Sequence, residues 1–382
     1  MTGRAATMAR AGRAVRVLAA ALLGGAVLLA GAGTAFAQAH PMAGPRLEPE
    51  GGYKVERGPF EVRVTDDLVL KDEQRGKDLR VKVRVPVAKG GGPMEGDGAS
   101  RPAYPLAIFS HGLGGSKDVF PDLCDHLASH GFVVVACSHA DSVQERRRDG
   151  EKVTRDNAFD LRLMNPEKRA ERVGDISFII DSVATLEKEC AGLGELATVD
   201  RAKIVLLGHS AGAYTTQLAS GMKVRDRENP AGEARPEKRI RVSVVISGQG
   251  VNRVAIREDA WSEIEIPMLV ITGSLDTSTI TSEVPATRRH PFEKSRGTAK
   301  GGPPVYLLWI EGATHASFGG KGATAVLRER PTTPVEVIQE CTHSAVLAFL
   351  DAHLRGNDAG RAYLVGEGMK ALSEGRATIS AK

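Results

Sequence analysis

Short apolar runs alternate along the chain with segments of helical spacing. The segment 79–86 alternates apolar and charged residues, which is typical of a strand with one wet face, whereas later runs are apolar throughout and predict fully buried strands. The predicted strands are 79–86, 106–109, 132–136, 204–207, 242–246, 268–271 and 305–310. The predicted helices are 119–130, 166–190, 211 to about 222, and 335–354. This alternation predicts an α/β fold with a mostly parallel central sheet and helices on both faces.

The first 37 residues differ in composition from the rest of the chain. They contain four arginines and no acidic residue, with an apolar run from Val17 and the small-residue pattern Ala35-Phe36-Ala37. These features predict a secretory signal peptide that is cleaved before Gln38. The alternative is an N-terminal membrane anchor. We therefore expect a secreted or periplasmic protein with no stable membrane span after cleavage.

The predicted organisation has three parts: a signal peptide (1–37), a Pro/Gly-rich lead-in segment (38–57) and one domain (58–382). The length of the third part suits one large α/β domain. Two long connections are predicted within it. Residues 88–103 form a Gly-rich surface loop, and 141–166 form a charged segment whose three consecutive arginines we interpret as solvated.

Charge and cysteine content narrow the function classes. The formal net charge is +4, and the four arginines of the predicted signal peptide account for all of it, so the basic character does not indicate a nucleic-acid partner. The cysteines Cys124, Cys137, Cys190 and Cys341 include no closely spaced pair, and we predict no metal and no organic cofactor. In an exported protein they form two disulfides or remain buried thiols, and the sequence leaves both alternatives open.

The apolar run 204–207 leads directly into Gly208-His209-Ser210-Ala211-Gly212. A Gly-x-Ser-x-Gly pattern between a buried strand and a helix is typical of a nucleophile elbow, a sharp turn that lifts the serine hydroxyl above the sheet. The strained turn requires tiny side chains two positions away on each side, which glycine supplies. The alternative is an ordinary tight turn, because a chain with 43 glycines also produces such a pattern by chance.

A serine hydroxyl needs a base to become a nucleophile. His315 follows the predicted strand 305–310, and ligands of parallel sheets bind beyond the carboxyl ends of the strands. His290, His343 and His353 also follow Ser210, but an arginine-rich loop and the last helix are typical places for surface or packing residues. The sequence therefore favours His315 as the base.

The histidine in turn needs a carboxylate that fixes its tautomer and stabilises the imidazolium. Asp276 is the carboxylate in the loop directly after the predicted strand 268–271. Glu311 is the alternative, although it lies too close to His315 along the chain to support the ring. The order Ser210, Asp276, His315 is that of α/β-hydrolase triads.

An acyl-transfer site also needs donors for a developing oxyanion. The backbone amide of Ala211 is one candidate, because it opens the helix after the elbow. The second is the amide of Leu113, in the Gly-rich loop SHGLGGSKD after the strand 106–109. In that loop we expect His111 to organise the backbone by hydrogen bonds. Phosphate binding is the other interpretation of such a loop, but no Lys-Ser or Lys-Thr pair closes it in the Walker manner.

Four segments together carry a family resemblance: FSHGLGGSKDVFPDLCDHLASHGFVVVACSHADS, VLLGHSAGAYT, LVITGSLDTS and IEGATHASF. They resemble the α/β-hydrolase superfamily, and most closely its branch of platelet-activating factor acetylhydrolases and dienelactone-hydrolase-like serine esterases. The resemblance spans about 58–354. It implies an α/β-hydrolase fold with Ser210, Asp276 and His315 as the catalytic triad and the amides of Leu113 and Ala211 as the oxyanion hole.

The chain departs from the related families in three respects. Ala213 stands where a further glycine often follows the elbow. Leu113 and the stretch 247–250 occupy places where the similar secreted polyester hydrolases carry aromatic residues. Dienelactone hydrolases proper use a cysteine nucleophile, so only their fold relation applies to a chain with Ser210.

The sequence thus predicts a secreted serine esterase that cleaves short- to medium-chain carboxylic esters through an acyl-enzyme on Ser210. The alternatives are a phospholipid acyl hydrolase of the platelet-activating-factor type, a polyester hydrolase, a peptidase with the same triad, or a non-catalytic binding module with this fold. The expected partner is a small-molecule or lipid ester, with no nucleic acid. The sequence does not indicate the physiological ester or the oligomeric state.

Overall fold

The computed structural model describes residues 52–89, 101–154, 156–194, 197–225, 230–232, 234, 236–252, 255–278 and 280–382. The compact unit Leu47–Lys382 contains all of them. The predicted signal peptide, most of the lead-in segment and most of the loop 88–103 lie outside the described residues.

Strands and helices alternate through most of this unit. The strands are β1 (Glu61–Asp72), β2 (Lys77–Val87), β3 (Ala103–Ser110), β4 (Val133–Ser138), β5 (Thr198–His209), β6 (Ile240–Ile246), β7 (Met268–Leu275), β8 (Val305–Thr314) and β9 (Ala377–Ala381). The α-helices are α1 (Pro121–Ser129), α2 (Val143–Arg148), α3 (Pro166–Asp181), α4 (Val183–Glu189), α5 (Ala211–Ala219), α6 (Pro285–Arg288), α7 (His290–Lys294), α8 (Gly320–Leu327), α9 (Val335–Leu354), α10 (Asp358–Val365) and α11 (Gly368–Leu372). Short 3₁₀ helices are η1 (Leu161–Met164), η2 (Thr298–Lys300) and η3 (Ser317–Gly319).

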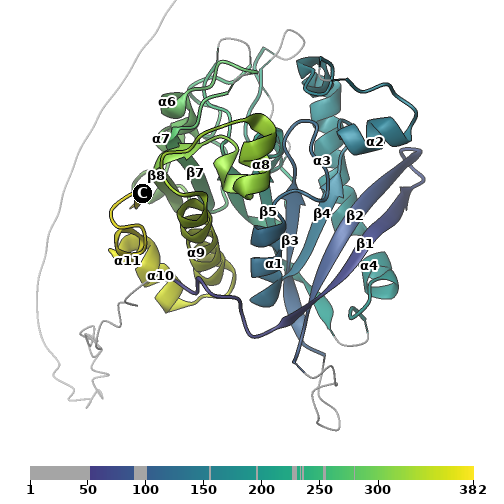
Figure 1. The fold of residues 1–382 in the computed structure, drawn as a ribbon, viewed down its shortest axis with the longest axis horizontal. Helices are drawn as coiled ribbons and strands as arrows, with labels where there is room; N and C mark the ends of the chain where they lie inside the picture. The colour runs from purple at the N-terminus through teal and green to yellow at the C-terminus, as the bar shows by residue number, and fades with distance from the viewer. Residues whose placement is uncertain are drawn as a thin grey trace, which may run out of the picture. The chain divides into compact units, whose positions relative to one another are not determined.

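The strands of the described residues form one sheet in the order β1-β2-β4-β3-β5-β6-β7-β8-β9 (Figure 1). The strands from β4 through β8 in this order pair in parallel, and the two edges, β1-β2-β4 and β8-β9, pair antiparallel. The predicted fold class is confirmed. Because β3, β5, β7 and β8 run in the same direction, the loops that follow them all lie at the carboxyl ends of the parallel strands.

The two faces of the sheet are buried against different helices. In β3, Ala107 and Phe109 belong to an apolar cluster with α1 and α9, whereas Leu106 and Ile108 belong to a second cluster with α3 and α4. In Figure 1, α1 and α9 lie in front of the strands. Burial on both faces explains why these strands read as continuous apolar runs.

Three segments differ from the sequence-based prediction, in addition to the unpredicted elements β9, α6, α7, α8, α10 and α11. The predicted helix 166–190 is two helices, α3 and α4, which meet where the Ser182 amide donates to both the Phe178 and Ile179 carbonyls and tightens the turn. The strand β1 was not predicted, because a register shift between Thr65 and Leu68 interrupts its alternation. The solvated loop predicted for 141–166 is wrong in part, since α2 forms there.

The arginine run in α2 is only partly solvated. Arg146 is buried, and its guanidinium donates to both carboxylate oxygens of Glu151 and to the Asn157 carbonyl oxygen. The ion pair with the exposed Glu151 carboxylate and the bond to the Asn157 carbonyl oxygen satisfy the guanidinium and allow its burial.

The four cysteines are all buried, free thiols. This settles the alternative that the sequence left open in favour of a fold without disulfides. Burial raises the pKa of the Cys124 thiol to about 11, so the thiol stays protonated and unreactive at neutral pH.

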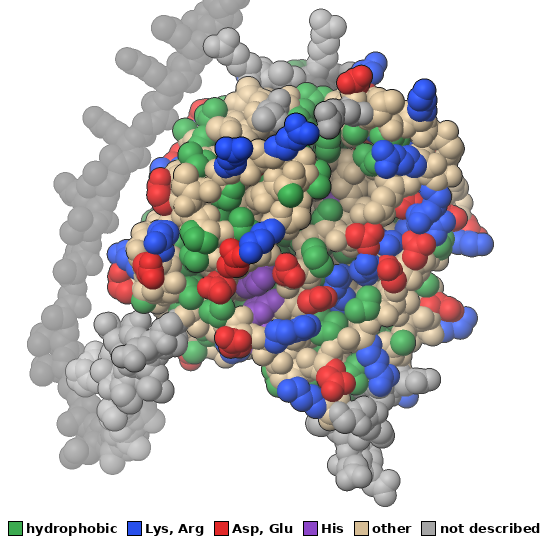
Figure 2. Space-filling view, in the orientation of Figure 1, with side chains coloured by type: hydrophobic (Ala, Val, Ile, Leu, Met, Phe, Trp, Pro, Cys, Tyr) green, Lys and Arg blue, Asp and Glu red, His purple; other side chains and the backbone are tan. Residues whose placement is uncertain are grey.

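Figure 2 shows acidic and basic side chains interspersed over the visible face. Within the described residues, no helix has the length and hydropathy needed to cross a membrane. In the same residues, no group of three or more His, Cys, Asp or Glu side chains is arranged to hold a metal ion.

Candidate active site

Ser210 lies in a strained turn between β5 and α5, with φ 55° and ψ −116°. A Cβ atom at Gly212 would lie 1.9 Å from the Ser110 carbonyl oxygen, and one at Gly208 would lie 2.2 Å from the Gly212 carbonyl oxygen. Both glycines are therefore required by close backbone approach. The surrounding packing holds the serine in this unfavourable conformation and places its side chain beyond the end of the strand.

The imidazole of His315 faces the Ser210 hydroxyl. His315 follows β8, and its Nε2 lies 3.0 Å from Ser210 Oγ. Two residues separated by 105 positions along the chain are thus brought within hydrogen-bond distance. The His315 side chain remains 12% exposed, so the pair is accessible from outside the core.

The opposite nitrogen of His315 contacts Asp276, which follows β7. His315 Nδ1 lies 2.9 Å from Asp276 Oδ1, and the Thr272 hydroxyl donates to Asp276 Oδ2 at 2.8 Å. Burial alone would raise the pKa of Asp276, but the Arg288 charge and the hydrogen bonds hold it well below its usual range. An ionised carboxylate accepts from Nδ1–H, which leaves Nε2 free to accept the serine proton.

Arg288 is a fourth buried group in this cluster, and the sequence analysis did not identify it. Its Nε lies 3.2 Å from Asp276 Oδ1, and its Nη2 lies 3.3 Å from His315 Nδ1. The guanidinium also donates to the carbonyl oxygens of Ser247 and Gly248 after β6. The only sequence signal was an arginine-rich stretch, and the short helix α6 that turns Arg288 inward has no distinctive pattern.

His209, which precedes the serine, supports the loop of His315. Its Nε2 lies 2.9 Å from the His315 carbonyl oxygen, and the two rings are 4.7 Å apart. Burial lowers the pKa of His209 to about 3, so the ring is neutral and its Nε2–H donates to that carbonyl.

The rival side chains are engaged elsewhere. Nδ1 of His290 accepts from the Val251 amide, Nε2 of His353 lies near the Tyr306 hydroxyl, and His343 stacks on His126. Glu311, the rival of Asp276, accepts from the Ser274 hydroxyl. The structure thus joins Ser210, His315 and Asp276 and leaves each of the alternatives outside the cluster.

The Gly-rich loop after β3 packs directly against the elbow. A Cβ atom at Gly112 would lie 3.3 Å from Ser210 Cβ, so this loop and the serine are in contact. Within the described residues, the structure gives neither the Leu113 amide nor the Ala211 amide an acceptor in the protein. An oxyanion hole needs two such amide donors, and the assignment of Leu113 and Ala211 to it stays a prediction.

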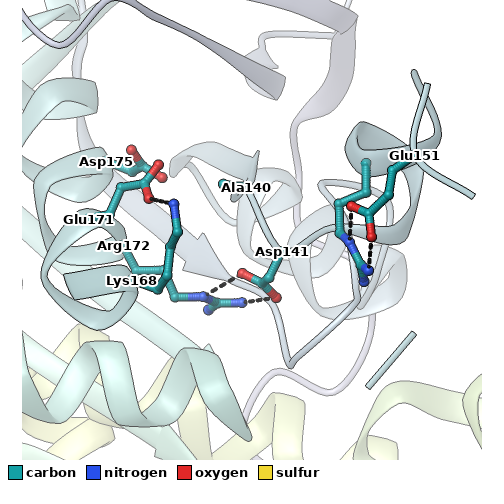
Figure 3. Close-up of a pocket in the computed structure, with 8 residues that line it drawn as sticks. Ala140, Asp141, Glu151, Lys168, Glu171, Arg172 and Asp175 are labelled. Atoms are coloured by element: carbon teal, nitrogen blue, oxygen red, sulfur yellow. Dashed lines mark hydrogen bonds and ion pairs between the residues drawn. The ribbon is translucent and has the colours of Figure 1, made fainter. Parts of the chain in front are cut away.

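A separate charged cavity lies near α3 (Figure 3). It has a volume of about 180 Å³. Its lining residues are Ala140, Asp141, Arg146, Glu151, Lys168, Glu171, Arg172 and Asp175. None of these residues is Ser210, Asp276 or His315, so the cavity is distinct from the serine cluster.

Comparison with known proteins adds independent information. Residues 74–160 match the family described as platelet-activating factor acetylhydrolase, isoform II, and this stretch contains the loop of Leu113. The chain is 32% identical to the platelet-activating factor acetylhydrolase of Bos taurus over 138 residues, which are 29% of this chain and 31% of the relative. It is 23% identical to that of Cavia porcellus over 323 residues, 73% of this chain and 64% of the relative.

The chain is similar in sequence to the platelet-activating factor acetylhydrolases. The resemblance predicted from the sequence is therefore confirmed. A further match, 53% identical over 38 residues, is a protein of Schizosaccharomyces pombe named putative phospholipase A2; it covers 10% of this chain and 9% of the relative. The chain spans about a third of the length of the first platelet-activating factor acetylhydrolases it matches.

Proposed function

We propose that this protein is a serine ester hydrolase of the phospholipid acyl hydrolase type, which cleaves a short acyl ester through an acyl-enzyme on Ser210. The proposal rests on one observation: His315 Nε2 lies 3.0 Å from the Ser210 hydroxyl while its Nδ1 lies 2.9 Å from buried Asp276. A serine, a base and an orienting carboxylate in this geometry form the arrangement that activates a hydroxyl for acyl transfer.

The proposed reaction proceeds in two halves. Ser210 Oγ attacks the acyl carbon while its proton moves to Nε2 of His315, and the amides of Leu113 and Ala211 donate to the oxyanion. The tetrahedral intermediate expels the alcohol, which takes the proton from Nε2. Water then loses a proton to Nε2 and attacks the acyl carbon of the acyl-enzyme. The second tetrahedral intermediate breaks its bond to Ser210 Oγ, which takes the proton back from Nε2 as the acid is released.

Two features support a lipid ester as the substrate class. The relatives are named platelet-activating factor acetylhydrolases and a putative phospholipase A2. In addition, the segment that carries Asp276 exposes the apolar side chains of Leu275, Ile280 and Val284. Exposed apolar side chains in the segment of the proposed triad aspartate suit an acyl or alkyl chain better than a polar ester.

A series of acyl lengths tests the substrate class. We expect kcat/KM to be at least about tenfold higher for p-nitrophenyl butyrate than for the palmitate ester, because each poorly accommodated methylene weakens transition-state binding. We also expect release of the sn-2 acyl group from a phospholipid with an sn-2 acetyl chain but not from one with an sn-2 oleoyl chain. Faster turnover of the palmitate and oleoyl substrates would contradict the short-acyl assignment.

Removal of Arg288 is expected to change the pH dependence. The ring of His315 faces three ionisable groups: Asp276 after β7, Arg288 in α6 and His209 in β5. The Arg288 charge lowers the pKa of Asp276, so in Arg288→Gln that pKa should rise and the acid limb of the kcat/KM profile should move to higher pH. The neighbouring Arg289→Gln is the control, because the Arg289 side chain is 44% exposed and pairs with Glu293. An unchanged limb in Arg288→Gln would refute the electrostatic role.

We also propose that residues 1–37 direct export and are then removed. Arginines before an apolar run and a small-residue cleavage pattern support this proposal. N-terminal sequencing of the exported protein is expected to begin at Gln38. Retention of the leader on a membrane-bound protein would support the anchor instead.

A further inference from the structure

A buried arginine lies behind the loop that carries Leu113. Arg172 of α3 is 2% exposed, and its Nε and Nη2 donate to the two carboxylate oxygens of Asp141 at 2.8 and 2.9 Å. Figure 3 shows this fork-like pair in the wall of the charged cavity. Burial alone would raise the pKa of Asp141, but the Arg172 charge lowers it below its usual range, so the pair is ionic.

The pair holds the loop backbone on both sides of Leu113. Nη1 of Arg172 donates to the His111 carbonyl oxygen at 2.9 Å. The Gly114 amide donates to Asp141 Oδ2 at 3.0 Å. One side of the loop is therefore fixed through its carbonyl and the other through its amide, while the Leu113 amide between them is left without an acceptor among the described residues.

The neutral side chain of His111 and the backbone of His139 add hydrogen bonds that connect the Leu113 loop to the core. The His139 amide donates to His111 Nε2 at 2.9 Å, so His111 carries its proton on Nδ1 and donates it to the Gly112 carbonyl oxygen at 2.6 Å. Burial lowers the pKa of His111 to about 4, so this tautomer persists at neutral pH. The loop backbone is thus hydrogen-bonded at residues 111 and 112 before Leu113 and at residue 114 after it.

The buried end of this hydrogen-bond network contains a second series of serine, histidine and aspartate side chains, in the same order as the cluster at Ser210. Ser110 Oγ lies 2.9 Å from His139 Nε2, and His139 Nδ1 lies 2.9 Å from Asp175. These three side chains are fully buried, and Asp175 is also paired with Arg75 and Lys77. The second serine–histidine–aspartate set therefore has no path to a substrate, and its hydrogen bonds brace the end of β3.

We propose that Arg172 and Asp141 are positioning residues that hold the backbone on both sides of Leu113 and so set the direction of its amide. The catalytic part of this inference rests on the proposed function. Loss of the pair frees the loop, and the oxyanion then loses one donor. Loss of a single oxyanion donor lowers kcat by about 100- to 1,000-fold, and a donor that is only misaligned loses less.

The test compares Arg172→Met and Asp141→Asn with the parent protein. Both are expected to lower kcat for p-nitrophenyl acetate by about 10- to 100-fold with KM changed by less than about threefold, because the amide acts on the transition state. Hydrogen exchange at residues 112–115 should rise in both. Asp141→Asn preserves volume, so it keeps the test available if Arg172→Met does not fold.

Arg169→Met is the matched control, because Arg169 lies one turn earlier on α3 and donates instead to the Tyr214 hydroxyl. It should leave both measurements unchanged. The inference is overturned if kcat falls without faster exchange in the loop, if exchange rises without loss of kcat, or if neither changes. Should the parent protein hydrolyse no ester, the proposed function fails, while the exchange measurement still decides whether the pair holds the loop.

Discussion

Replacing Ser210 by alanine is expected to abolish ester hydrolysis while the protein stays folded. The substitution removes the only hydroxyl that faces His315 Nε2 among the described hydrogen bonds, at 3.0 Å, and leaves the β5 backbone unchanged. Loss of a serine nucleophile lowers kcat by about a millionfold in a well-studied serine protease. Turnover of p-nitrophenyl acetate and labelling by a fluorophosphonate should both disappear, with the circular dichroism spectrum retained.

Ser220→Ala is the control for this experiment. Ser220 follows the same helix, α5, and its buried hydroxyl donates to the Thr216 carbonyl oxygen. That variant should keep its labelling and most of its activity. Hydrolysis by Ser210→Ala at more than a small fraction of the parent rate would show that another group is the nucleophile.

Replacing Asp276 by asparagine is expected to lower both kcat and stability. The imidazolium formed during acyl transfer would lose its anionic partner and would still face the Arg288 guanidinium at 3.3 Å. A triad aspartate contributes about 10⁴-fold to kcat elsewhere. A buried cation left unpaired is destabilising by about 3–5 kcal/mol. Steady-state kinetics and urea unfolding at pH 7 measure the two effects.

The double variant Asp276→Asn/Arg288→Gln separates the two effects. It should recover much of the lost stability, because no buried charge remains unpaired, and it should recover little activity.

The pKa of Asp276 is depressed in the folded protein, so this ion pair stabilises the fold above the unfolded pKa of about 3.9 and its contribution is lost as pH falls below that value. Equal stability of parent and Asp276→Asn at pH 7 would contradict the buried ion pair.

The parallel strands could be predicted because burial on both faces leaves a continuous apolar run. The strand β1 could not, since it is an edge strand with a bulge and many polar positions. The elbow at Ser210 was readable because Gly208 and Gly212 are forced by backbone contacts that no side chain tolerates. His315 and Asp276 followed from their places at strand ends.

The charged groups around the site were not predictable in the same way. Arg172 lies in the charge-rich helix α3 and Arg288 in the four-residue helix α6. Nothing in either local sequence distinguishes a buried arginine from a solvated one. Their burial depends on partners far along the chain, Asp276 for the first and Asp141 for the second. Ion pairs of this kind produce no periodic pattern and no fixed residue spacing that could be recognised in the sequence.

The buried set of Ser110, His139 and Asp175 bears on how hydrolases are recognised. A search that matches three side chains by distance alone would find two candidate centres among the residues that the structure describes. Only the one at Ser210 combines the left-handed backbone of a strand-to-helix turn with a solvent-reachable imidazole. Automated recognition of serine hydrolases should therefore also test main-chain conformation and solvent accessibility. A template of three side-chain positions alone would also match the buried set at Ser110.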